Sequence, residues 1–125
     1  MTKTSMIIWE REFNLNMYFQ SCADKTMLEK QTIAYNAFLK SEGAIAAALP
    51  KLKAYIEKNY STRIPEKQIS NIFKYVIPQM IFVPKQSGGN AIALMCDFKF
   101  DLEHGLALVF VNEQLKEIGS QDIIL

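Results

Sequence analysis

The sequence predicts an α+β fold: an N-terminal strand or hairpin, two to three helices, and a C-terminal antiparallel sheet of four or five strands. An alternation typical of strands comes first, helical patterns follow, and nearly continuous apolar runs fill the last third of the chain. Strands that are separated from helices along a sequence are typical of α+β domains with antiparallel sheets. The length of 125 residues suits one domain, so residues 1–125 are expected to form a single α+β unit.

The first element is expected between Ile7 and Ser21, where apolar and polar residues alternate. A period of two with a mostly polar second face indicates a half-buried antiparallel strand. Arg11 interrupts the apolar face, and Asn14 and Asn16 are residues that favour a turn. The segment is therefore either one long strand or a hairpin of two shorter strands.

Two amphipathic helices are expected next, joined as a helical hairpin. Thr26 and Glu29 have the spacing of a capping box at the start of the first helix, and Gly43 suits its end in the left-handed conformation. Apolar residues at positions 45, 49, 52 and 56 indicate the second helix. Pro50 lies inside that pattern, so it either kinks the helix or places its start near residue 49.

A third helix is expected to begin at Pro65 and to end at Pro78, because proline suits a first helical turn and does not continue a helix. Turn signals then separate the apolar runs, and the clearest are Gly88-Gly89-Asn90 and the hairpin loop that Gly105 closes with a positive φ. The expected strands are residues 81–83, 91–100, 106–112, 115–118 and 123–125.

Composition argues against several classes of function. The net charge is +1 and the 14 basic residues form no cluster, so nucleic-acid binding is not expected. The apolar runs are far shorter than the roughly 20 residues that cross a membrane, and no signal peptide is recognised, so a cytoplasmic protein is expected. Cys22 and Cys96 belong to no Cys-x-x-Cys pair, so both are expected to be reduced, without a disulfide or a zinc site.

The one dense polar cluster comprises Asp97, Asp101, Glu103 and His104, with Asp122 further along the chain. Carboxylates and an imidazole are ligands for divalent metals, and the single histidine titrates near neutral pH, as a general base must. Turn chemistry is the simpler interpretation, since an aspartate at a turn bonds nearby backbone amides. A metal site made of the first four residues is therefore the alternative, and no catalytic residue is assigned.

Trp9, the single tryptophan, stands beside a charged run at residues 10–12. It suits an anchor in a protein interface, and it equally suits a cover over one end of the core. No cofactor is expected, because the sequence lacks the glycine-rich dinucleotide, phosphate-loop and nucleophile-elbow motifs.

A spaced pattern runs through the C-terminal third, from Cys96-Asp97 through Asp101 to Glu103-His104-Gly105, and ends with Gly119-x-Gln121-Asp122. With this pattern, Cys-Asp-x3-Asp-x-Glu-His-Gly … Gly-x-Gln-Asp, the chain resembles a bacterial family of small uncharacterised α+β domains. Relatives in that family are similar to immunity-type proteins encoded beside secreted bacterial toxins. The resemblance implies an α+β fold and a protein partner, and it implies no catalytic residues.

Three functional hypotheses follow. The favoured one is a non-catalytic, immunity-type domain that occupies the surface of another protein, without nucleic acid or membrane. One alternative is a metal-binding protein or metal-dependent enzyme that uses the polar cluster, and the other is a structural module that forms a homodimer through its strand edges. The candidate binding residues are Trp9, Glu103, His104, Gln121 and Asp122.

Overall fold

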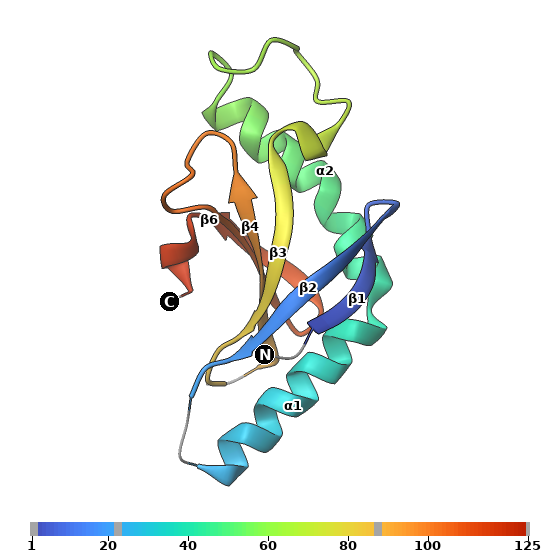
Figure 1. The fold of residues 1–125 in the computed structure, drawn as a ribbon, viewed down its shortest axis with the longest axis vertical. Coiled ribbons are helices and arrows are strands. Elements are labelled where there is room, and N and C mark those ends of the chain that lie inside the picture. Colours follow the sequence, from blue (N-terminus) through green and yellow to red (C-terminus); the bar gives the residue numbers. More distant parts are fainter. Residues whose placement is uncertain (1–2, 22–23, 87–88, 125) are drawn as a thin grey trace.

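The computed structural model describes residues 3–21, 24–86 and 89–124, and it contains two helices against one sheet (Figure 1). The N-terminal half holds β1 (Lys3–Ile8), β2 (Arg11–Phe19), α1 (Lys25–Lys40) and α2 (Glu42–Asn59). The C-terminal half holds the short 3-10 turn η1 (Ile72–Lys74), β3 (Val76–Val83), β4 (Ala91–Phe98), β5 (Leu106–Val111), β6 (Gln114–Gly119) and the 3-10 turn η2 (Gln121–Ile123). No helix among the described residues is long and apolar enough to cross a membrane.

The six strands form one sheet in the order in which they occur along the chain. Neighbours are antiparallel except β2 and β3, which are parallel. Parallel neighbours need a long crossover connection, and here α1 and α2 provide it. The α+β class is confirmed, and β3 to β6 pair antiparallel with one another, but the expected strand 81–83 is only the end of β3. The N-terminal segment belongs to the same sheet, so the sheet is mixed and has six strands.

The N-terminal segment is a hairpin, but its turn lies at Trp9 and Glu10, where φ is 50° and 71°. Two consecutive residues with positive φ make the kind of two-residue turn whose twist matches that of paired strands. The expected turn near Asn14 and Asn16 is therefore wrong, since both lie inside β2. The turn at Trp9 and Glu10 could not be predicted from the sequence, because neither tryptophan nor glutamate commonly adopts positive φ.

The two expected helices are present with different ends. Asp24 is the N-cap of α1, and its carboxylate accepts a hydrogen bond from the Thr26 amide at 2.9 Å. The expected capping box is therefore wrong, because Thr26 already lies inside the helix. Gly43 does not end α1 either, since it lies in the first turn of α2 and the joint falls at Ser41. Pro50 lies inside α2, so the alternative that the helix starts near residue 49 is wrong.

The expected third helix and last strand are wrong. Residues 61–71 are irregular, and helical structure is limited to the single turn η1. The Glu57 carboxylate accepts a hydrogen bond from the Ile69 amide at 2.8 Å, and so stabilises this irregular backbone. Pro78 lies in β3 beside a shift in the β3–β4 register, a position that tolerates a missing amide. The expected strand 123–125 begins in η2, and Leu125 lies outside the described residues.

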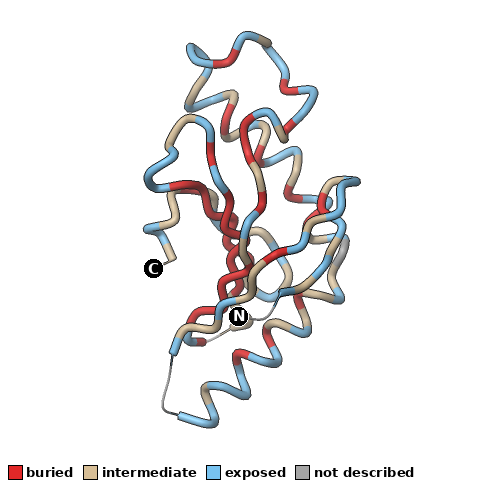
Figure 2. Tube along the Cα trace, in the orientation of Figure 1, coloured by how far each residue is buried: buried red, intermediate tan, exposed pale blue. Residues whose placement is uncertain are grey.

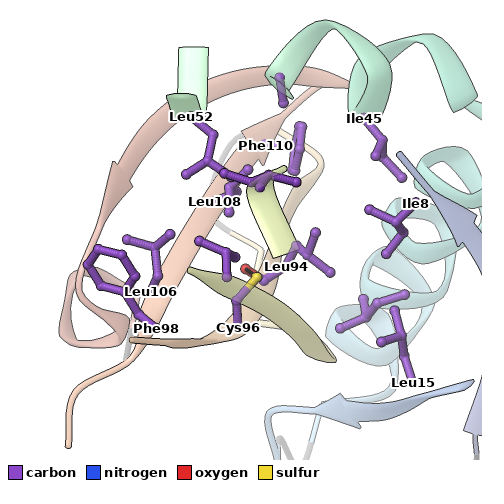
Figure 3. Packing of buried hydrophobic residues seen from close by; sticks show 14 of the residues in the cluster. Ile8, Leu15, Ile45, Leu52, Leu94, Cys96, Phe98, Leu106, Leu108 and Phe110 are labelled. Carbon is purple, nitrogen blue, oxygen red and sulfur yellow. Dashed lines mark hydrogen bonds between the residues drawn. The ribbon is translucent and has the colours of Figure 1, made fainter. Parts of the chain in front are cut away.

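The main core lies between the helices and one face of the sheet (Figures 2 and 3). Ile8 of β1 and Ile45 of α2 are both buried in it, and their side chains lie near each other in Figure 3. A smaller cluster covers the other face of the sheet. Its buried members are Phe82, Ala93, Met95, Ala107 and Val109. The central strands are therefore apolar on both faces, which explains their nearly continuous hydrophobic sequence.

Candidate functional site

Asp101 stabilises the loop between β4 and β5 through its contacts with His104. A carboxylate oxygen of Asp101 accepts a hydrogen bond from the His104 amide and lies 3.1 Å from the His104 imidazole Nδ1. The hydrogen bond and charge of Asp101 raise the pKa of His104, and the His104 amide lowers the pKa of Asp101. The His104 side chain is 47% exposed, and Glu103 is also exposed. This is the turn chemistry that the sequence favoured.

The polar cluster does not assemble into a set of metal ligands. Asp97 is exposed on β4, where its carboxylate accepts a hydrogen bond from the Gln79 side chain at 2.9 Å. Among the residues that the structure describes, no three His, Cys, Asp or Glu side chains are grouped to hold a metal ion. The geometry therefore gives no support to the metal-binding alternative.

The two halves of the C-terminal sequence pattern meet in space. The Gln121 side-chain amide donates to the Cys96 carbonyl at 3.2 Å, and the Gln121 backbone amide donates to the His104 carbonyl at 3.2 Å. Gly105 lies between them with φ 63°. Asp122 is exposed, and its charge contributes to the raised pKa of His104. The pattern therefore describes how the C-terminal turn attaches to the sheet.

Cys96 supplies no reactive thiol. Cys96 is free and fully buried on β4, and burial raises its thiol pKa far above the usual range. A thiol in that state is a small apolar core residue and a poor nucleophile. Cys22 lies outside the described residues.

Trp9 follows the edge strand β1 and lies beside the start of α2, whereas the His104 loop joins β4 and β5. Its indole N–H donates to the Ile45 carbonyl at 3.0 Å, and its ring lies 6.0 Å from the Phe73 ring. Pro50 has no amide proton, so the neighbouring Ala46 carbonyl lacks its usual partner within the helix. Because Trp9 is partly buried and packs against the main core, it covers one end of that core, as one of the two interpretations had it. It also lines a cavity.

This cavity, called the β1 groove below, has a volume of about 740 Å³ and lies between β1 and the α1–α2 joint. Figure 1 shows β1 beside that joint. Residues 4–7 of β1 belong to its lining, and the helix residues that line it are all apolar. The described lining residues are Thr4, Ser5, Met6, Ile7, Trp9, Glu10, Glu12, Phe38, Leu39, Ile45 and Ala46. Glu10 and Glu12 are the charged ones, so the rim is acidic.

A second cavity of about 430 Å³ lies at the opposite edge, between α2 and β6. Lys51, Lys58 and Lys116 line it together with Glu117, so its charge is mainly positive. The neighbouring strand pair carries a register shift at Val109. A bulge and charged side chains are features that protect an edge strand from pairing.

The sequence indicated Trp9 as a binding candidate but missed the rest of the β1 groove. Met6, Glu12, Ile45 and Ala46 come together only because the hairpin turns at residues 9 and 10 and packs on the helix joint. Alternation along the first strand was the one visible signal. It could not show that this strand lies at the edge of the sheet.

The sequence model of one family, described as a domain of unknown function (DUF6985), matches residues 2–125. No curated protein and no solved structure matches the chain. The match covers nearly the whole chain, and the protein therefore belongs to the DUF6985 family.

Proposed function

We propose that this DUF6985 protein is a non-catalytic protein-binding domain whose partner docks in the β1 groove. The observation that carries the proposal is an edge strand beside a partly apolar cavity of about 740 Å³. Apolar concave surfaces with a few polar groups are the usual binding sites of proteins. An edge strand adds backbone amides and carbonyls that a protein partner can pair with.

The polar loop is a poorer candidate for activity. Asp101 and His104 are close enough for acid–base chemistry, but they lie on an exposed turn that neither cavity includes. A catalytic pair needs a pocket that positions a substrate and excludes water. Binding by the β1 groove requires no such pocket around the loop.

The biological setting of the proposal comes from the resemblance of the C-terminal pattern to immunity-type proteins. In this setting the protein works in the bacterial cytoplasm and neutralises its partner by occupying the partner's surface. Glu103, His104, Gln121 and Asp122 then serve the fold of the C-terminal turn, and of the five candidate binding residues only Trp9 lies at the docking site.

Two matched variants test the proposal. Ala46 and Ala54 are both exposed residues of α2, and they line the β1 groove and the second cavity, respectively. We expect Ala46→Arg to fill the β1 groove and to lower recovery of the partner from the native lysate at least tenfold. Ala54→Arg should leave recovery within about twofold of wild type.

Quantitative mass spectrometry of the proteins captured by the two variants and the wild type gives the comparison. The partner is the protein that Ala46→Arg loses and Ala54→Arg keeps, and its affinity for the three purified chains is then measured. Equal capture by both variants would contradict the proposal. Circular dichroism establishes that both variants are folded.

A further inference from the structure

We infer that the partner binds by adding an extended segment to β1, and that this segment alternates apolar and basic side chains. The inference rests on the proposed function and specifies the chemistry of the partner at the β1 groove. Addition of a strand to an exposed edge is a recurrent way to bind peptides, in which the backbone supplies affinity and the flanking pockets supply specificity.

The backbone of β1 is oriented for this addition. Among the described strands, β1 has β2 as its one neighbour, and six consecutive residue pairs join them from Lys3↔Asn16 to Ile8↔Arg11. A two-residue turn closes on a hydrogen-bonded pair, here Ile8↔Arg11, and such pairs alternate along antiparallel strands. The amides and carbonyls of Lys3, Ser5 and Ile7 therefore point away from β2.

A hydrogen bond beyond the hairpin agrees with this assignment. The Gln20 amide donates to the Val83 carbonyl at 2.8 Å, so even-numbered positions at the end of β2 point toward β3. The odd-numbered positions then point toward β1. Leu15 pairs with Thr4, so the backbone amide and carbonyl of Thr4 point toward β2. The backbone amide and carbonyl of Ser5 therefore point away from β2, toward the open edge.

The two edges of the sheet differ in how they are protected. β6 lies beside a register shift and carries Lys116 and Glu117. β1 is regularly paired with β2, carries one charged residue, Lys3, and has an isoleucine, Ile7, that is 69% exposed. Exposed, regular and weakly charged edges are the ones that accept another strand. β1 is therefore the edge at which a partner strand can join the sheet.

The side chains around β1 select the sequence of the added strand. Toward the helices, Met6 lies in the same cavity as Phe38 and Ile45, which suits apolar partner residues. On the other face of the hairpin, Ile7 pairs with Glu12, and the Glu12 carboxylate also accepts the Ser5 hydroxyl at 3.3 Å.

An added strand would lie about 4.8 Å from β1 and about 10 Å from β2, which is within reach of a lysine or arginine side chain. Glu10 and Glu12 are the charged residues among the described lining of the groove, and both are acidic. Successive residues of a strand point to opposite faces, so one face of the partner meets the apolar wall and the other meets the acidic rim. The complementary segment therefore alternates apolar and basic residues.

Substitutions at Ser5 test the strand addition directly. Ser5→Pro removes the outward amide while leaving the amides that pair with β2 in place. Ser5→Ala is the matched control, because it loses the hydroxyl but keeps the amide. The probe is a phage-displayed library of random nine-residue peptides, selected on the full chain, and the enriched peptides are then synthesised.

We expect enriched peptides with alternating apolar and basic residues, and a change in the fluorescence of Trp9, the single tryptophan, when they bind. Ser5→Ala should bind them within about twofold of wild type, and Ser5→Pro should bind at least tenfold more weakly. No enrichment, peptides without this alternation, or equal binding by Ser5→Pro would each overturn the inference.

Amide exchange keeps the inference testable if Ser5→Pro fails to fold. In wild-type protein, exchange at Ser5 and Ile7 should slow when the peptide binds, and unchanged exchange would overturn strand addition. If the protein forms a dimer in the absence of peptide and Ser5→Pro converts it to a monomer, the strand added to β1 comes from a second copy of the chain. That result would overturn the inferred partner segment. If Ala46→Arg loses the partner but Ser5→Pro keeps the peptides, strand addition fails and the proposed function stands. If Ala46→Arg and Ala54→Arg capture the same proteins, the proposed function itself fails.

Discussion

Gln121 attaches the C-terminal turn to the centre of the sheet, because its side-chain amide donates to the Cys96 carbonyl across 3.2 Å. Cys96 is fully buried on β4, and Gln121 follows β6, so this contact joins elements that β5 separates in the sheet. Gly105, immediately before β5, is so close to both partners that a side chain there would meet them. The spacing between the two halves of the sequence pattern thus has a structural explanation.

We predict that Gly105→Ala destabilises the protein by roughly 2 kcal/mol or more. A Cβ atom at Gly105 would lie 2.5 Å from Gln121 Nε2 and 2.7 Å from the Cys96 carbonyl oxygen, and φ is 63°. The matched control is Gly43→Ala in α2, where a Cβ atom would meet nothing within 4 Å. The control should be stabilised by up to about 1 kcal/mol, because alanine is the better helix former. Urea denaturation measures both, and equal stability of the two variants would contradict this account.

The second prediction concerns the pKa of His104, which NMR can follow because it is the single histidine. We expect it above the ordinary value of 6.5, since Asp101 bonds and faces the imidazole. Asp101→Asn should lower it markedly, and Glu103→Gln should lower it less, because Glu103 acts through its charge alone. A His104 pKa that Asp101→Asn leaves unchanged would contradict the arrangement of the loop.

The same pair makes stability depend on pH in a defined direction. The raised pKa of His104 adds stability that is complete below 6.5 and is lost as pH rises through the folded-state value. The lowered pKa of Asp101 adds stability that is complete above 3.8 and is lost as pH falls through its folded-state value. The contribution of the pair is therefore largest between those two ordinary values. In His104→Gln the decline on the alkaline side should disappear.

Local sequence signals predicted much of the fold. Helical spacing located both helices, the apolar runs located β4, β5, β6 and the last residues of β3, and Gly105 adopts the expected positive φ. These features depend on residues close together in the chain. The prediction of a third helix was wrong because Glu57, in α2, accepts a hydrogen bond from the Ile69 amide and stabilises an irregular backbone there. A local sequence pattern cannot reveal this contact.

The parallel pairing of β2 with β3 and the β1 groove could not be predicted, because both depend on which strands become neighbours. Asn16 pairs with Met80 across the entire helical segment. Trp9 was recognisable as an unusual residue, but its cavity requires Ile45 and a turn made of residues that rarely take positive φ. The candidate site was therefore accessible to sequence only as isolated residues.

The fourth prediction is that Gln31→Leu destabilises the protein by roughly 2 kcal/mol. The buried Gln31 side-chain amide lies within hydrogen-bonding distance of the carbonyls of Gln20, Val83 and Pro84, at 2.9, 3.2 and 3.3 Å. Leucine fills the space but leaves these buried carbonyls without the Gln31 donor. Losing a buried donor lowers the free energy of unfolding more than losing an exposed hydrogen bond does. Thr32→Ala is the control, since its exposed hydroxyl donates to the Leu28 carbonyl of its own helix. Thermal unfolding followed by circular dichroism compares them, and similar losses in both would count against this role for Gln31.

Reversing the charge of Glu12 is the sharpest test of partner selection at the β1 groove. Glu12→Lys should weaken binding of the alternating basic peptides roughly tenfold at low salt, which corresponds to about 1.4 kcal/mol. The effect should shrink at high ionic strength, because screening weakens interactions between exposed charges. Glu117→Lys, on the edge strand β6, makes the same change of charge at the opposite side of the sheet and should leave affinity within about twofold. Fluorescence titration of Trp9 at two salt concentrations measures all three chains. An equal loss in both variants would mean that net charge alone attracts the peptides, whereas a loss confined to Glu12→Lys assigns their selection to the acidic rim beside β1.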